Sequence, residues 1–86
     1  MTLKNLLMDT HSLGNNNGSG TILAEFSTPG EAVQCYRSVW DAFDKGDMQG
    51  LGDECVQSWT CHNYFTIMME KDIDIVNDYI LMICGE

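Results

Sequence analysis

Apolar side chains recur every three or four residues between residues 28 and 45, a spacing that predicts an amphipathic helix. The apolar face consists of Ala32, Tyr36, Val39 and Phe43, flanked by Val33 and Trp40. A face this broad has to be covered by other parts of the chain. We therefore expect this helix to be the main one, with the remaining elements arranged around it.

The two ends of this segment carry helix-capping residues. Thr28 can act as N-cap, Pro29 suits the first helical position, and Glu31 stands three residues after the cap. At the other end Lys45 falls in the last turn, and Gly46 is suited to a left-handed cap. These residues predict that the helix begins after residue 28 and ends at residue 45.

The first part of the chain has the pattern of a β-hairpin. Apolar and polar residues alternate over residues 21–26, which predicts a strand with Ile22, Ala24 and Phe26 on one face. Residues 3–10 fit a short helix or a strand. We favour a strand that pairs with residues 21–26 through a flexible, Asn- and Gly-rich loop over residues 11–20.

The second half of the chain is less regular. A shorter second helix is expected from Asp47 over residues 47–59, with Met48, Leu51 and Cys55 along one side. Residues 64–67 suit a buried strand, and the apolar run at residues 79–84 is assigned to a strand, although a helical rhythm is also present there. The expected fold class is α+β, with a small antiparallel sheet packed on the main helix over residues 28–45.

Length and composition indicate a single globular domain over residues 1–86, since 44% of the residues are hydrophobic and 20% are charged. The formal net charge is -9, and from residue 39 onward ten acidic residues face only two basic ones. Nucleic-acid binding relies on Lys and Arg to neutralise phosphates, so direct binding of nucleic acid is not expected. The charge favours a partner with a basic protein surface.

Four cysteines allow three disulfide pairings in an oxidising compartment. The N-terminal segment has too short an apolar stretch for a signal peptide or a membrane span. We therefore expect a cytoplasmic protein, with no membrane contact and with reduced thiols, three of them buried.

The patterns that suggest chemistry do not reach the requirements of a site. Cys55, Cys61 and His62 lack the paired spacing of zinc ligands, and an EF-hand loop counted from Asp41 places Phe43 where an oxygen ligand is needed. Adjacent Cys and His residues do not by themselves form a nucleophile pair. We expect no enzymatic activity, no metal and no cofactor.

The acidic residues have a more specific interpretation, because carboxylates spread over a surface can imitate the phosphates of a nucleic acid. The predicted partner-binding residues are Asp41, Asp44, Asp47, Asp53, Glu54, Glu70, Asp72, Asp74 and Asp78. The first three stand at three-residue steps that run off one side of the main helix. Trp59 and Tyr64 are assigned either to the core or to an interface.

Two resemblances follow from these residues. The segment YRSVWDAFDKGDMQGL at residues 36–51 resembles the start of the cone-shaped fold shared by scytalone dehydratase and SnoaL-like proteins. In size, charge and acidic series, the chain resembles at class level the small acidic inhibitors that phages encode against bacterial defence, anti-CRISPR proteins in particular. This second resemblance implies a noncatalytic inhibitor of a CRISPR effector or another nucleic-acid-processing complex, acting in the bacterial host cytoplasm.

Two other functions stay open at this stage. One is a small ligand-binding or enzymatic domain of the cone-fold type, which a deep pocket with a histidine beside a carboxylate would support. The other is a homo-oligomerisation or adaptor module, which an exposed apolar face would support. The oligomeric state is not predicted.

Overall fold

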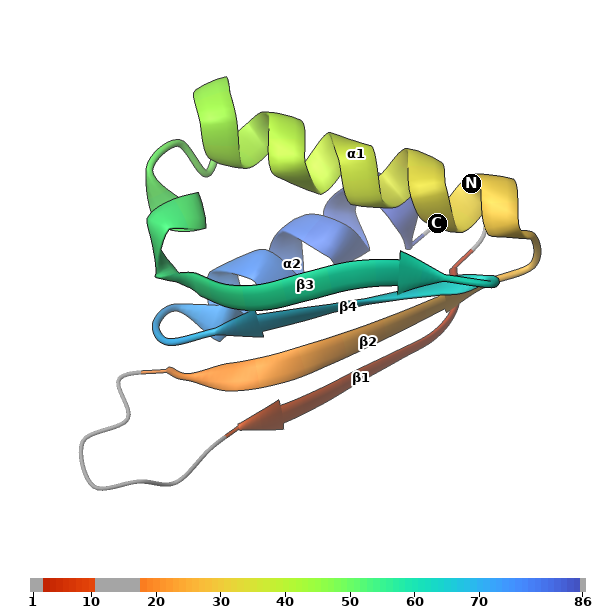
Figure 1. The fold of residues 1–86 in the computed structure, drawn as a ribbon, viewed down its shortest axis with the longest axis horizontal. Helices are drawn as coiled ribbons and strands as arrows, with labels where there is room; N and C mark the ends of the chain where they lie inside the picture. Colours follow the sequence, from red (N-terminus) through yellow and green to blue (C-terminus); the bar gives the residue numbers. More distant parts are fainter. Residues whose placement is uncertain (1–2, 11–17, 86) are drawn as a thin grey trace.

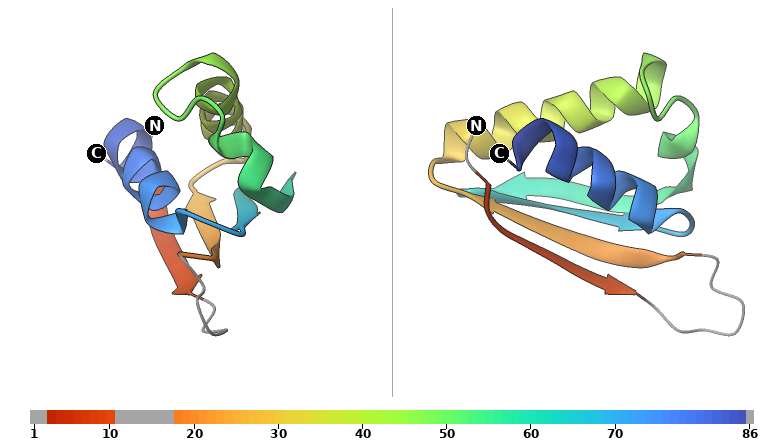
Figure 2. Two further views of the ribbon diagram at one scale, coloured as in Figure 1. Left: turned by 90° about the vertical axis from the view of Figure 1, so that its left-hand side faces the viewer. Right: turned by 180° about the vertical axis from the view of Figure 1, so that it is seen from behind.

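The computed structural model describes residues 3–10 and 18–85, and these form two layers. One antiparallel sheet has the strand order β1-β2-β4-β3, made of β1 (Leu3–Thr10), β2 (Gly20–Phe26), β4 (Tyr64–Met69) and β3 (Cys55–Cys61). The helix α1 (Pro29–Lys45) connects β2 to β3, and α2 (Ile73–Cys84) follows β4. Both helices cover the same face of the sheet, and no helix formed by residues 3–10 and 18–85 lies on the other face (Figure 1, Figure 2). The predicted α+β class is therefore confirmed.

The N-terminal hairpin forms as predicted. β1 (Leu3–Thr10) pairs antiparallel with β2 (Gly20–Phe26), so that Leu6 lies opposite Ala24 and Leu7 opposite Leu23. The predicted loop over residues 11–20 lies outside the described residues at positions 11–17. β2 is an inner strand, and every second side chain along it is buried.

The main helix, α1 (Pro29–Lys45), also forms as predicted. Thr28 is the N-cap, and its hydroxyl accepts a hydrogen bond of 3.3 Å from the amide of Glu31. The left-handed cap predicted at Gly46 is wrong, since its φ is -118°. Glycine is needed there for another reason, because a Cβ would lie only 2.9 Å from the Cα of Ala42.

The second helix predicted over residues 47–59 does not form. A turn at residues 46–50 leads into a single 3-10 turn, η1 (Leu51–Glu54), and then into β3 (Cys55–Cys61), which pairs with β4 (Tyr64–Met69). Gly50 has a positive φ of 88°, which reverses the chain before a helix can extend. The edge of β4 that is not paired with β2 then supplies backbone partners for residues 55–61. The strand predicted at residues 64–67 is confirmed as part of β4.

The C-terminal segment is a helix, α2 (Ile73–Cys84), so the strand assigned to residues 79–84 is wrong. Its buried residues are Ile73, Val76, Ile80 and Cys84, which is the helical rhythm present in the sequence. A strand over residues 79–84 would have given the consecutive residues Leu81 and Met82 opposite environments, but both are exposed. α2 is thus the shorter second helix of the fold, located at the end of the chain.

The core lies between the sheet and the two helices. Phe65 of β4 is central to it: its ring centroid lies 5.8 Å from that of Phe26 and 5.6 Å from that of Tyr36. The hydroxyl of Tyr36 also shares a hydrogen bond of 2.8 Å with the Ser58 hydroxyl, which joins α1 to β3. No helix in the described ranges is long and apolar enough to cross a membrane.

A disulfide joins the two helices within this core. Cys35 of α1 and Cys84 of α2 are bonded, and both are buried. The prediction of reduced thiols is therefore wrong for this pair. Their separation of 49 residues gave no indication of it, because the contact depends on α2 being a helix that packs beside α1.

Candidate functional site

The predicted partner-binding carboxylates are distributed over several elements. Asp41 and Asp44 lie on α1, Asp47 follows it, and η1 carries Asp53 and Glu54. The remaining four are in the β4–α2 turn and on α2, namely Glu70, Asp72, Asp74 and Asp78. Glu54 and Asp72 are half-buried and the other seven are exposed.

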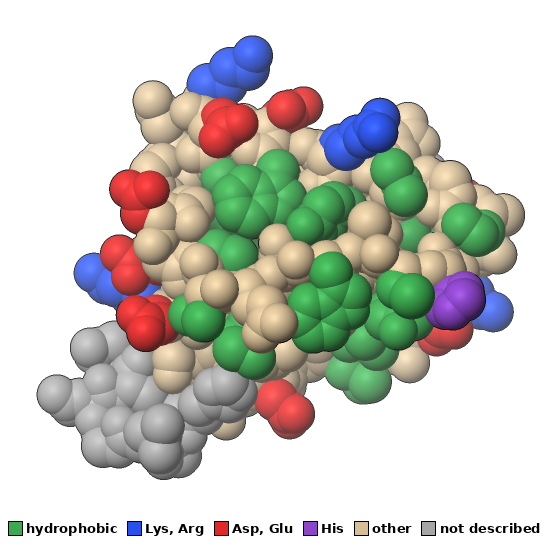
Figure 3. Space-filling view, viewed as in Figure 1, with side chains coloured by type: hydrophobic (Ala, Val, Ile, Leu, Met, Phe, Trp, Pro, Cys, Tyr) green, Lys and Arg blue, Asp and Glu red, His purple; other side chains and the backbone are tan. Residues whose placement is uncertain are grey.

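Part of this set comes together at one end of the molecule. Asp47, Glu54 and Asp72 line an open depression of about 310 Å³. The amide of Glu70 donates a hydrogen bond of 2.8 Å to the carbonyl of Glu54, which fixes the β4–α2 turn beside η1. Acidic side chains accordingly gather where the end of α1, η1 and this turn meet, at the left in Figures 1 and 3. We call this region the acidic end.

The acidic end also has an apolar part. Met48, Leu51 and Ile75 line the same depression, and Ile75 is 49% exposed. Lys71 is the only cation among the described residues that line it. Such a depression can bind a Lys or Arg side chain of a partner, with the charged group beside the carboxylates and the aliphatic stem against the apolar side chains.

The structure does not bring all nine carboxylates together. Asp41 and Asp44 lie on α1, whereas Asp47 lies in the turn beyond it, because α1 ends at Lys45 as predicted. Asp74 and Asp78 are four residues apart on α2 and extend from the acidic end along that helix. The acidic surface is therefore one cluster with two extensions along the helices.

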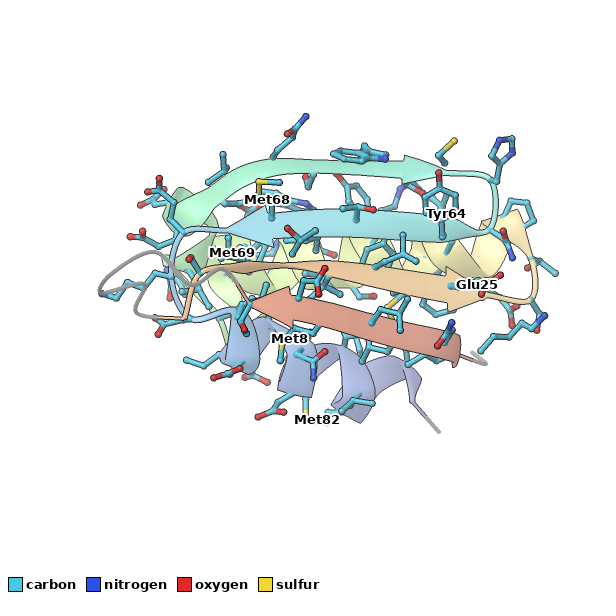
Figure 4. All side chains as sticks on the ribbon, turned by 90° about the horizontal axis from the view of Figure 1, so that it is seen from below. Met8, Glu25, Tyr64, Met68, Met69 and Met82 are labelled. Atoms are coloured by element: carbon cyan, nitrogen blue, oxygen red, sulfur yellow. A yellow bond between two sulfur atoms is a disulfide. The ribbon has the colours of Figure 1, made fainter. Side chains whose placement is uncertain are left out.

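The uncovered face of the sheet was not predicted from the sequence. Strand register places three rows of side chains on it, each crossing all four strands, as seen from below in Figure 4. The middle row is Leu7, Leu23, Thr66 and Trp59; the outer rows are Asn5, Glu25, Tyr64 and Cys61, and Asp9, Thr21, Met68 and Gln57.

This open face combines apolar side chains with acidic ones and holds no Lys or Arg at these twelve positions. Leu7 is 54% exposed and Trp59 is 41% exposed, so the middle row offers apolar surface to solvent. Glu25 and Asp9 are its charged members. A signal was present in the sequence, because the apolar residues of β2 and β4 occupy both phases of the alternation. It predicted burial on both faces, but nothing in the described chain covers the second.

Two groups in this region have shifted pKa values. On the open face, a side-chain hydrogen bond with Cys61, followed by the electrostatic interaction with the same side chain, raises the pKa of Tyr64 above its usual value. On the helix side of β3, burial raises the pKa of the Cys55 thiol above its usual value. Hydrogen bonds with Ser58 and Gln57 act in the opposite direction there but are smaller effects.

The residues considered for metal binding do not converge. Within residues 3–10 and 18–85, no three His, Cys, Asp or Glu side chains are placed to hold one metal ion. Cys55 and Cys61 belong to opposite sides of β3, because the strand has a register shift between Cys55 and Gln57. His62 occupies the β3–β4 turn, and no described histidine lines the depression at the acidic end.

No protein-family model, no curated protein and no solved structure matches this chain. The function is therefore argued from the acidic end and the open sheet face themselves.

Proposed function

We propose that this chain is a noncatalytic acidic binding protein that inhibits a partner by covering its basic, nucleic-acid-binding surface. The observation that carries the proposal is the acidic end, where Asp47, Glu54 and Asp72 share one depression. The net charge of -9 adds a long-range attraction to any basic surface. No cofactor or metal takes part in such a function.

The chemistry of inhibition follows from the surface. Carboxylates held on a folded domain present negative charge to Lys and Arg side chains that otherwise contact phosphates. The exposed Ile75 and the half-buried Leu51 give the same surface an apolar contact that does not depend on charge. The partner is a basic groove of a CRISPR effector or another nucleic-acid-processing complex. The proposed location is the cytoplasm of a phage-infected bacterium, where the Cys35–Cys84 disulfide persists only if its burial protects it from cellular reductants.

A homo-oligomerisation or adaptor module is the second candidate, favoured by the exposed apolar row on the open face of the sheet. Sedimentation analysis at several concentrations separates the two proposals. A monomer that binds a basic partner agrees with inhibition, whereas a stable oligomer without such binding agrees with the module.

The proposed inhibition is tested with a purified CRISPR effector and its guide RNA, by measuring target-DNA binding with and without this protein. We expect inhibition that weakens with salt, since the Debye length falls from about 10 Å at 0.1 M to about 3 Å at 1 M. A double variant, Asp44→Lys with Asp47→Lys, should slow association by at least about tenfold through the loss of electrostatic steering.

A matched control carries the same change in charge at another place. The double variant Asp9→Lys with Glu25→Lys alters the open face and leaves the acidic end intact. Equal loss of association in both doubles would show that only net charge matters, and unchanged association in the first would contradict the proposed role of the acidic end.

A further inference from the structure

β3 is an edge strand whose outer side has no partner strand among the described residues. Its hairpin with β4 closes through two residues, with Cys61 opposite Tyr64. In a two-residue hairpin the flanking pair is hydrogen-bonded, and bonded and non-bonded pairs then alternate along the ladder. Cys61 and Trp59 therefore bond to β4, while the amides and carbonyls of Ser58 and Thr60 point outward.

Apart from one register shift near its start, this edge lacks the features that usually prevent strands from pairing. Natural edge strands carry charged residues or proline, and β1, the opposite edge, contains Lys4 and Asp9. β3 has the sequence CVQSWTC, with no charged residue and no proline. Its register shift lies at one end, between Cys55 and Gln57, which leaves residues 57–61 in regular pairing.

The side chains around the edge are suited to an apolar neighbour. Val56 is 56% exposed and Trp59 is 41% exposed, which are large values for residues of a short strand. Figure 3 shows hydrophobic side chains along the middle of this side of the molecule, with most of the acidic groups toward one end. A strand added here would cover part of this apolar surface and extend the open face of the sheet.

Charge identifies the kind of strand that fits. Asp53 and Glu54 come directly before β3, and the amide of Glu70 is bonded to the Glu54 carbonyl at the same end. A neighbouring strand would run about 4.8 Å from β3, well inside the distance over which these carboxylates act. A second copy of this chain brings another charge of -9, whereas a cationic segment gains from the same field.

We propose that β3 binds an extended segment of a partner protein as a fifth strand of the sheet. The segment has apolar side chains in its middle and Lys or Arg at the end beside Asp53, Glu54 and Glu70. Backbone hydrogen bonds to Ser58 and Thr60 supply affinity, and the carboxylates of the acidic end favour a segment that carries positive charge. This inference rests on the proposed function, because it specifies how a basic partner is engaged.

The probe is a fluorescein-labelled peptide of alternating Val and Thr with Lys at both ends, followed by fluorescence anisotropy. One comparison peptide has Glu in place of Lys, and another has N-methyl groups on alternate residues, which remove backbone donors. We expect binding of the Lys peptide alone. Hydrogen exchange should show new protection at the amides of Ser58 and Thr60 when it binds.

Two variants of one residue separate backbone from side chain. Thr60→Pro removes an outward amide and no backbone bond to β4, and should weaken Lys-peptide binding about tenfold, the value of one ladder hydrogen bond. Thr60→Ala removes the side chain, including its bond to the Tyr64 carbonyl, and keeps the amide. It should bind like the unaltered protein. If Thr60→Pro does not fold, strand addition is tested by hydrogen-exchange protection of the Ser58 and Thr60 amides in the unaltered protein.

The outcomes distinguish this proposal from the proposed function. Lys-peptide binding without protection of Ser58 and Thr60 would overturn strand addition and leave acidic binding in place. Equal binding of the Glu peptide would keep strand addition and contradict the preference for a basic partner. Failure of every peptide to bind, or a homodimer that Thr60→Pro dissociates, would also overturn the proposal.

Discussion

The two faces of the sheet use the same strands and both carry apolar side chains, yet they differ in what covers them. On one face Ile22, Phe65 and Ile67 are fully buried beneath α1 and α2. On the other, Leu7 and Trp59 remain exposed in a row that crosses all four strands. Apolar content alone therefore does not identify the core, because only the face covered by helices contributes fully to stability. Apolar surface on the open face remains available for binding.

The largest effect that this comparison predicts is at Phe65. Phe65→Ala should lower the free energy of unfolding by about 3–5 kcal/mol, because its ring packs against Phe26 and Tyr36 and a cavity would remain. Leu7→Ala, on the open face, should cost less than about 1 kcal/mol. Urea denaturation followed by fluorescence measures both. Similar losses for the two variants would show that both faces are covered in solution.

The next largest effect concerns the disulfide between the helices. Cys84→Ala should lower the free energy of unfolding by about 4 kcal/mol, because the bond closes a loop of 49 residues and restricts the unfolded chain. A reducing agent should have the same effect on the unaltered protein. Cys61→Ala on the open face is the control and should leave stability nearly unchanged. A thermal midpoint that does not respond to reduction would contradict the prediction.

The local signals in the sequence were sufficient for α1 and for the N-terminal hairpin, since capping at Thr28 and alternation over β2 act over a few residues. They failed for Cys55–Cys61 and for α2. Met48, Leu51 and Cys55 kept helical spacing, but Gly50 reversed the chain and β4 supplied partners to a strand. In α2 the apolar residues fitted both the helical and the strand period. Which of the two structures forms depends on packing against the sheet, and this is not visible in the local sequence.

The candidate site was predictable in composition and not in arrangement. Charge alone suggested a basic partner, and the acidic residues were identified individually. Their gathering at the acidic end depends on how η1 meets the β4–α2 turn through Glu54 and Glu70, a contact between segments that are distant in sequence. The open face and the free edge of β3 depend on strand order, which no local pattern specifies.

The smallest effect is chemical and compares two free cysteines of one strand. Cys61 faces the open side beside Tyr64, whereas Cys55 faces the helix side and contacts the core. Burial raises the pKa of the Cys55 thiol above its usual value, so a smaller fraction of this residue is the reactive thiolate at pH 8 than without burial. Its alkylation by iodoacetamide should therefore be slower than that of Cys61. Raising the pH should increase the Cys55 rate, because more of the thiol ionises. Mass spectrometry of Cys55→Ser and Cys61→Ser assigns each rate to its residue. Equal rates would mean that burial does not slow the reaction of Cys55, and the prediction would be wrong.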